Sequence, residues 1–173
     1  MQKNSPSMVL RGTKGMGQSS ILKPSINMAL LRYIVDRLHP LLNSPYRLRD
    51  KQGEKIGHIK IGEVGEKMAR LRLYANGRKI LYTNFRGPNG GEVDIIARDG
   101  NTLSFVEVKT RRKRSTSRPL DAVNFKKQQL IRRGARAWLK LLKDEDILWR
   151  FDVVEVELTE GENPEITVIE GAF

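Results

Sequence analysis

The chain of 173 residues contains no cysteine and only two histidines, His39 and His58. Without thiols it can form neither a disulfide framework nor a thiolate zinc site, and two histidines are too few for a histidine-rich metal centre. Any bound metal ion would therefore be held by oxygen ligands. The sequence also lacks an apolar run of membrane-spanning length and a secretory signal, so we expect a cytoplasmic protein with no membrane partner.

Acidic residues are scarce in two long stretches of the chain. Residues 1–60 carry 11 Lys and Arg against 3 Asp and Glu, and residues 109–143 carry 13 against 1. The last thirty residues reverse the balance, with 10 acidic residues against 1 basic, and the net charge is +12. Concentrated positive charge indicates a polyanionic partner, most often nucleic acid, although acidic proteins and anionic lipids could use the same surface.

The first third of the chain is predicted to lie outside the main domain. Residues 1–25 contain no acidic residue and no sustained periodicity, so we expect a flexible basic tail, whose composition also resembles that of an organellar transit peptide. Apolar spacing predicts a short helix over residues 26–38, and residues 45–57 are polar enough for a linker. We therefore divide the chain into a basic extension, residues 1–58, and a domain, residues 59–173.

The domain has enough hydrophobic content for one core, because 39% of the whole chain is hydrophobic. Its periodicity predicts the order α-β-β-β-α-β-β, which is most economically satisfied by a mixed sheet flanked by helices, an α/β fold. The predicted elements are a helix through Val64, Met68, Leu71 and Ala75 that stops at Gly77, strands at 79–86, 92–97 and 102–108, a basic loop at 109–118, a helix at 119–143 with Val123, Leu130, Ala137, Trp138 and Leu141 on its apolar face, and strands at 147–158 and 165–169.

The second and third strands form the hairpin on which the functional prediction rests. Asp94, Glu107 and Lys109 interrupt otherwise apolar strands, where an ionised group is costly unless it is paired or bound to a metal. The Asp99-Gly100 pair favours a two-residue turn, which would put Glu107 near Glu92 with Asp94 diagonal on the same face. A loop with an odd number of residues would place the two sets on opposite faces.

Two carboxylates on one strand face could hold a hard divalent cation. Mg²⁺ and Mn²⁺ prefer oxygen ligands and can activate a bound water, so Asp94 and Glu107 form a candidate metal pair. Lys109 lies two residues beyond Glu107, where its ammonium could hold the attacking water or neutralise a developing oxyanion. The expected chemistry is hydrolysis of a phosphodiester bond. A structural ion-pair cluster is the alternative interpretation.

Seven ordered motifs carry a resemblance to a known family: Gly62-x-x-Gly65-Glu66-x-x-Ala69, Asn84-x-Arg86, Gly91-Glu92-Val93-Asp94-Ile95-Ile96-Ala97, Phe105-Val106-Glu107-Val108-Lys109-Thr110-Arg111, Val123-x-x-x-Lys127-Gln128, Arg150-Phe151-Asp152-Val153-Val154 and Ala172-Phe173. Over residues 59–173 the chain resembles the YraN-like family of uncharacterised bacterial proteins. That family is similar to the restriction-endonuclease-like PD-(D/E)xK superfamily, which includes archaeal Holliday-junction resolvases. Val93 departs from the superfamily pattern, where Pro is usual.

The resemblance implies a restriction-endonuclease-like sheet with Asp94 and Glu107 as metal ligands and Lys109 as the catalytic lysine. Glu66 matches a further acidic residue that often completes such sites, although it could also simply favour the first turn of its helix. Glu92 is either another ligand or an exposed charge. Junction resolvases act as dimers, so a homodimer is one candidate state, but no sequence feature identifies a two-fold interface.

Six basic residues are expected to contact phosphates: Arg86, Arg111, Arg112, Lys113, Arg114 and Lys127. The prediction is thus an Mg²⁺- or Mn²⁺-dependent endonuclease-like protein that binds nucleic acid, with DNA favoured over RNA and structured DNA as a candidate substrate. One alternative is a nucleic-acid-binding module with the same fold and no significant catalysis. Another is an interaction protein that recruits a partner through its N-terminal extension.

Overall fold

The computed structural model describes residues 27–113, 124–142 and 146–173. Their elements are helices α1 (Met28–Leu38), α2 (Pro40–Asn43), α3 (His58–Ala75) and α4 (Phe125–Leu142) and strands β1 (Lys79–Arg86), β2 (Glu92–Asp99), β3 (Thr102–Arg112), β4 (Leu148–Leu158) and β5 (Glu165–Ile169). From α3 onward the order of elements is the predicted one. The tail at residues 1–25, the position of Arg114 and the start of the second predicted helix at Pro119 lie outside the described residues.

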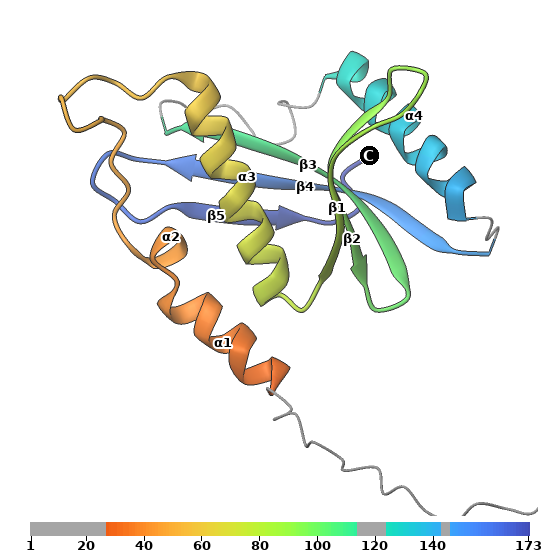
Figure 1. Ribbon diagram of the computed structural model, residues 1–173, viewed down its shortest axis with the longest axis horizontal. Coiled ribbons are helices and arrows are strands. Elements are labelled where there is room, and N and C mark those ends of the chain that lie inside the picture. The colour runs from red at the N-terminus through yellow and green to blue at the C-terminus, as the bar shows by residue number, and fades with distance from the viewer. Residues whose placement is uncertain (1–26, 114–123, 143–145) are drawn as a thin grey trace, which may run out of the picture.

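The five strands form a single sheet in sequence order, β1-β2-β3-β4-β5. Three of the four neighbouring pairs are antiparallel, and β3 and β4 are parallel, joined by the crossover that contains α4. Figure 1 shows α3 and α4 on opposite sides of this sheet, with β1 and β2 twisted away from β4 and β5. The predicted mixed sheet flanked by helices is therefore confirmed.

Two hydrophobic clusters lie on the two faces of the sheet. One joins Met68 and Leu73 of α3 to Ile95, Val106 and their neighbours. The other joins α4 to the opposite face through Ile131, Ala135, Phe105 and Phe151. Side chains alternate along a strand, so Glu107 and Lys109, which share the parity of Phe105, point to the side that α4 covers.

Two glycines allow the helices to approach the sheet closely. A Cβ atom on Gly65 of α3 would lie 1.8 Å from Oγ1 of Thr110, and one on Gly91 would lie 2.2 Å from the backbone nitrogen of Gly134 in α4. Neither position has room for a side chain. The approach at Gly91 fixes α4 against the first residues of β2, beside Glu92.

The predicted apolar face of the second large helix is partly wrong. The residues of α4 that are buried are Ile131, Gly134 and Ala135, whereas the predicted Leu141 is 66% exposed. The small residues at 134 and 135 define the buried stripe because the helix backbone comes so near the sheet at this point.

The basic loop expected at residues 109–118 is also corrected, because β3 continues to Arg112. Its last residues pair in register with β4, with Lys109 beside Glu155 and Arg111 beside Glu157. The strand can continue through a run of cations because its neighbour supplies carboxylates at matching positions.

The segment that precedes α3 packs onto the domain. Leu42 and Leu48, placed in the predicted extension, are buried in the cluster beneath α3. Residues predicted as a linker also make specific hydrogen bonds, including Tyr46 N to Glu162 O at 2.9 Å and Leu48 N to Glu160 Oε2 at 2.7 Å. The predicted helix is present as α1, and no helix among the described residues is long and apolar enough to cross a membrane.

Candidate hydrolytic site

The β2–β3 turn has an even number of residues, which places the predicted charges on one face. Asp99 pairs with Thr102, so the two-residue loop is Gly100-Asn101 and not Asp99-Gly100. This moves the register by two residues relative to the prediction. The last pair of the ladder is Ile95 with Val106. Continuing the same register by one residue places Asp94, not Glu92, opposite Glu107. Asp94 is thus closer to Glu107 than the sequence indicated.

Glu107 lies at the centre of the site. Its side chain is 2% exposed, and its Oε1 accepts a hydrogen bond of 2.8 Å from Nζ of Lys109. Its Oε2 is buried and accepts no hydrogen bond within the described residues, although Nζ of Lys127 lies 3.3 Å away. A buried carboxylate oxygen without a hydrogen bond is costly, so this atom is available to a further ligand.

The position of Asp94 is fixed by the backbone of the neighbouring strand. Its Oδ2 accepts a 2.8 Å hydrogen bond from the amide of Val108. The negative charge of Asp94 also acts on Glu107. Two carboxylates held this close repel one another unless a cation or a proton is shared between them.

Lys127 is the predicted phosphate contact that approaches the carboxylates. Its Nζ, on the first turn of α4, lies 2.6 Å from Oε1 of Glu92 as well as 3.3 Å from Glu107. Glu92 is therefore partnered by a lysine in this conformation. The ammonium group of Lys109 thus contacts Oε1 of Glu107, and that of Lys127 contacts Oε2.

The electrostatics of the site follow from burial. The pKa of Glu107 is raised to about 7: burial raises it most, the charge of Asp94 adds to the increase, and the hydrogen bond from Lys109 and the charges of the two lysines offset part of it. The hydrogen bond from Lys127 outweighs partial burial and lowers the pKa of Glu92. Burial lowers the pKa of Lys127, but the hydrogen bond to Glu92 and the surrounding carboxylates raise it above its usual value overall. Perturbed groups in contact are typical of functional sites.

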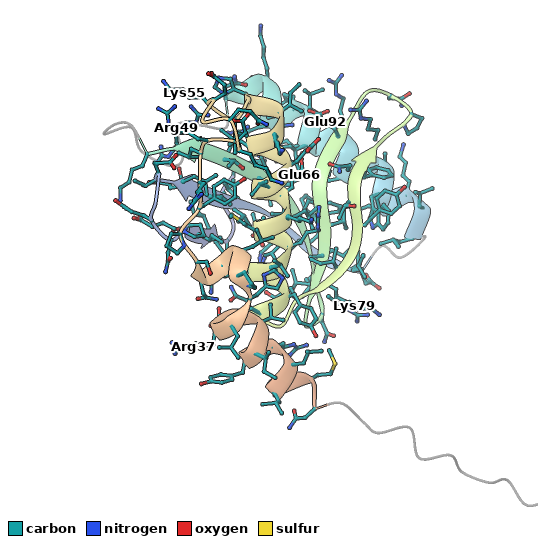
Figure 2. The ribbon with its side chains drawn as sticks, turned by 60° about the vertical axis from the view of Figure 1, so that its left-hand side comes forward. Arg37, Arg49, Lys55, Glu66, Lys79 and Glu92 are labelled. Carbon is teal, nitrogen blue, oxygen red and sulfur yellow. The ribbon has the colours of Figure 1, made fainter. Side chains whose placement is uncertain are left out.

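Glu66 lies on α3, the helix that covers the other face of β3. Oε2 of Glu66 accepts a 3.4 Å hydrogen bond from Asn84 and lies 3.9 Å from Arg70. Figure 2 shows Glu66 and Glu92 on the side of the molecule where α3 faces the β1–β2 hairpin. Across residues 27–113, 124–142 and 146–173 no group of three or more Asp, Glu, His or Cys side chains is arranged to hold a metal ion. The role of Glu66 stays a prediction.

The basic residues at the end of β3 are paired within the chain. Arg111 bonds to Glu157 and lies 2.9 Å from Glu155, the side chain of Arg112 donates to the carbonyl of Ile56, and Lys113 lies 2.6 Å from Glu165. Arg86 is exposed at the end of β1, and its charge helps to lower the pKa of Glu92. The structure thus places Arg86 and Lys127 near the carboxylates and engages Arg111, Arg112 and Lys113 elsewhere.

Sequence reasoning missed Glu155. Its side chain is 4% exposed and lies beside Lys109 in the register of β3 and β4. Its buried Oε1 accepts no hydrogen bond in the described part of the chain, although Nη2 of Arg111 lies 2.9 Å away. Burial raises its pKa, Arg111 lowers it and Glu157 raises it. The same signal that identified Glu107, a carboxylate inside a valine-rich strand, could have found it.

A second buried network is structural. Arg150 pairs with Asp152 at 3.0 Å, and Asp152 also binds Arg78 at 2.7 Å. Arg78 and Asp152 are 2% and 0% exposed. Ser104 donates to Asp152, and Glu170 accepts from Arg78. This network ties the end of α3 to β4 and lies apart from the Glu107 contacts.

Comparison with known proteins identifies the family. The model of an uncharacterised protein family, UPF0102, matches residues 65–156, which include β2, β3 and α4. A UPF0102 protein of Trichlorobacter lovleyi is 42% identical over 118 residues, covering 68% of this chain and 92% of the relative. One from Acetivibrio thermocellus is 40% identical over 130 residues, covering 73% of this chain and 100% of the relative.

A third relative, from Geobacter sulfurreducens, is 44% identical over 122 residues, covering 70% of this chain and 94% of the relative. The alignments take in nearly the full length of all three proteins. The chain therefore belongs to the uncharacterised protein family UPF0102, the YraN-like family that its motifs indicated.

Proposed function

We propose that the protein is a metal-dependent hydrolase of phosphodiester bonds in nucleic acid, with a restriction-endonuclease-like site. The observation that carries the proposal is Glu107, a buried carboxylate held next to Asp94 and contacted by Lys109 and Lys127. Such a cluster has no evident packing role inside the middle strand of a sheet, and its charges suit a cation and a phosphate. The positive charge of the chain suits the polyanionic substrate.

The donor set fits a hard divalent cation. Mg²⁺ is commonly held by only one or two protein carboxylates, with water and substrate phosphate at its other positions. Asp94 and Glu107 supply such a pair, and the unbonded Oε2 of Glu107 is a ready ligand atom. Bound there, Mg²⁺ or Mn²⁺ would supply an activated water and stabilise negative charge on phosphate.

The residues of the chain have distinct tasks in this proposal. Lys109 lies against Oε1 of Glu107, where its ammonium can orient a water or donate to a phosphate oxygen. Lys127 bridges Glu92 and Glu107 and holds α4 against the site. Arg86, at the mouth of the β1–β2 connection, is exposed and can contact a phosphate.

The test is cleavage of single-stranded, duplex and branched DNA and of RNA with Mg²⁺ or Mn²⁺, by the wild type and Asp94→Asn. An asparagine keeps an oxygen that can accept from the Val108 amide, so the variant removes charge with little change in shape. We expect at least about a 100-fold loss, because a metal contributes several kcal/mol to transition-state stabilisation. Asp50→Asn, an exposed turn residue, is the matched control. Equal activity of wild type and Asp94→Asn would refute the assignment.

Metal binding has a readout that needs no substrate. The melting temperatures of the wild type and of Asp94→Asn are first measured in EDTA, which gives a metal-free baseline for each protein. Adding Mn²⁺ at ten times its dissociation constant should stabilise the wild type by about 1.4 kcal/mol, and Asp94→Asn by much less. An equal rise in both proteins would show that the cation binds elsewhere.

A second candidate function is nucleic-acid binding without catalysis. It is favoured by Lys109 and Lys127, whose ammonium groups neutralise Glu107 from two sides. This candidate gives salt-sensitive binding, no cleavage with any divalent cation, and the same affinity for the wild type and Asp94→Asn.

A further inference from the structure

A cavity of about 460 Å³ lies between α4 and the β1–β2 connection, on the far side of the Gly91–Gly134 contact from Lys127. We call it the α4 pocket. Its lining includes Phe85 and Arg86 from the end of β1 and Arg133, Arg136, Lys140 and Leu141 from α4. Its volume falls in the range, roughly 300–1,000 Å³, of pockets that hold small-molecule groups.

The pocket gathers cations that form no salt bridge with a carboxylate among the described residues. Arg86, Arg133, Arg136 and Lys140 are exposed, and within residues 27–113, 124–142 and 146–173 none of them lies within 4.0 Å of an acidic group. Lys113, by contrast, is held by Glu165. Four unpaired cations around one concavity create a positive potential that attracts an anion.

The floor of the same pocket is apolar. Phe85, Leu141 and Ala137 line it, and Leu141 is 66% exposed. The ring of Phe85 is fixed by edge-to-face contacts with Trp138, at 5.2 Å between centroids, and with Tyr82, at 5.9 Å. Phosphates alone would need no apolar surface, whereas a base presents flat faces that gain from contact with apolar and aromatic side chains.

We propose that the α4 pocket receives an unpaired nucleotide of the substrate strand. Its base lies on Phe85 and Leu141, and its phosphates contact Arg133, Arg136 and Lys140. The assignment rests on the proposed action on nucleic acid and defines the substrate class as a strand with a single-stranded portion: an end, a flap or a branch.

The position of the pocket along α4 relates it to the carboxylates. Arg133 and Arg136 lie six and nine residues after Lys127, which is about 9 and 14 Å along a helix axis. Backbone phosphates of one strand follow each other every 3.4 Å along a duplex axis, and farther apart in an extended strand. The pocket therefore holds a nucleotide only a few positions from the bond next to Glu107.

The test measures binding of a labelled single-stranded oligonucleotide and of the matching duplex by fluorescence anisotropy, in EDTA so that no cleavage occurs. The wild type should prefer the single strand. Arg133→Ala/Arg136→Ala should bind it at least tenfold more weakly, and Leu141→Ser should weaken single-strand binding more than duplex binding. All three side chains are exposed, so the fold is preserved.

Lys60→Ala/Lys67→Ala is the matched control, because it removes the same charge from exposed positions of α3. Affinity within twofold of the wild type in this control supports the pocket. Equal losses in the two double variants, or a wild type that binds single strand and duplex alike, would overturn it.

The experiments can refute the proposal for the pocket and the proposal for the hydrolytic site independently. Pocket-dependent binding with no metal-dependent cleavage would leave the pocket and remove the hydrolase. Cleavage that needs Asp94 but is unaffected by Arg133→Ala/Arg136→Ala would leave the hydrolase and remove the pocket.

Discussion

At the scale of single residues, Glu107 is a carboxylate whose protonation is strongly changed by burial. It is 2% exposed and carries a pKa of about 7 in place of 4.5, chiefly because burial disfavours its charged form. The folded protein therefore binds a proton that the unfolded chain releases between pH 4.5 and 7. Across this window the stability contributed by protonated Glu107 is lost as the pH rises.

This linkage gives a prediction for Glu107→Gln in metal-free buffer. Glutamine resembles the protonated carboxyl, so the variant should match the wild type below pH 4.5 and become the more stable protein as the pH rises to 8. The gain should be on the order of 3 kcal/mol, since the pKa of Glu107 rises from 4.5 to about 7 and one pKa unit corresponds to about 1.4 kcal/mol. Thermal melts from pH 4 to 8 measure it, with Glu63→Gln, an exposed change on α3, as the baseline for loss of one charge. A difference independent of pH would contradict the assigned burial cost.

At the scale of elements, α3 offers two glycines with opposite expectations. Gly62 has no atom within 4 Å of its added Cβ, whereas at Gly65 the Cβ would meet Oγ1, Cβ and Cγ2 of Thr110 at 1.8–2.7 Å. Gly62→Ala should stabilise the protein by about 0.5–1 kcal/mol through helix propensity. Gly65→Ala should destabilise it by about 1–3 kcal/mol, because α3 must move away from β3.

Denaturant unfolding of the two variants and of the wild type measures the difference in stability. Because both variants replace a glycine of α3 by alanine, each serves as the control for the other. If Gly65→Ala were as stable as Gly62→Ala, the close approach of α3 to β3 would be refuted. The same variant reports on function only indirectly, since Glu107 faces the other side of the sheet.

Most elements could be predicted from the sequence because their signals are local. The alternation of apolar residues located β2 and β3, and Gly77 marked the end of α3. The hairpin register could not be fixed, because Asp99-Gly100 and Gly100-Asn101 are both acceptable two-residue turns and differ by a shift of two residues in pairing. A shift of two residues leaves each side chain on the same face of the sheet. The shared face of Asp94 and Glu107 could therefore be predicted, whereas their position directly opposite each other could not.

Long-range partners were the part that local patterns could not give. Arg111 and Lys113 meet Glu157 and Glu165, which are 46 and 52 residues away in the chain. The basic run, considered without its partners, therefore indicated contacts with phosphates, whereas in the fold these residues form ion pairs within the chain. The buried face of α4 was missed for a similar reason, since Gly134 is buried by the approach of another backbone and not by its own hydrophobicity.

At the scale of the whole molecule, internal pairing decides where the net charge of +12 is displayed. The acidic residues of β4 and β5 neutralise the cations at the end of β3, while Arg133, Arg136 and Lys140 on α4 stay unpaired within the described ranges. Among the described residues, α4 thus carries one positive surface, on the side of the sheet that Glu107 faces. A polyanion attracted to that surface is brought to the carboxylates.

The extent of the folded unit gives the last prediction. Residues 27–57 add the buried Leu42 and Leu48 to the cluster under α3, and the backbone of Tyr46 exchanges hydrogen bonds with Glu162 and Gly161. A chain that begins at residue 58 should therefore be less stable than one that begins at residue 27. Burial of two leucines corresponds to roughly 3–6 kcal/mol.

Urea unfolding of the two truncated chains measures this difference directly. A lower midpoint for the chain that begins at residue 58, together with a smaller slope, is the expected result, because less surface is exposed when it unfolds. Leu48→Ala in the longer chain separates packing from length, since it removes one buried side chain and leaves the segment in place. Equal midpoints for the two truncated chains would show that the segment before α3 is an appendage, as its composition alone had indicated.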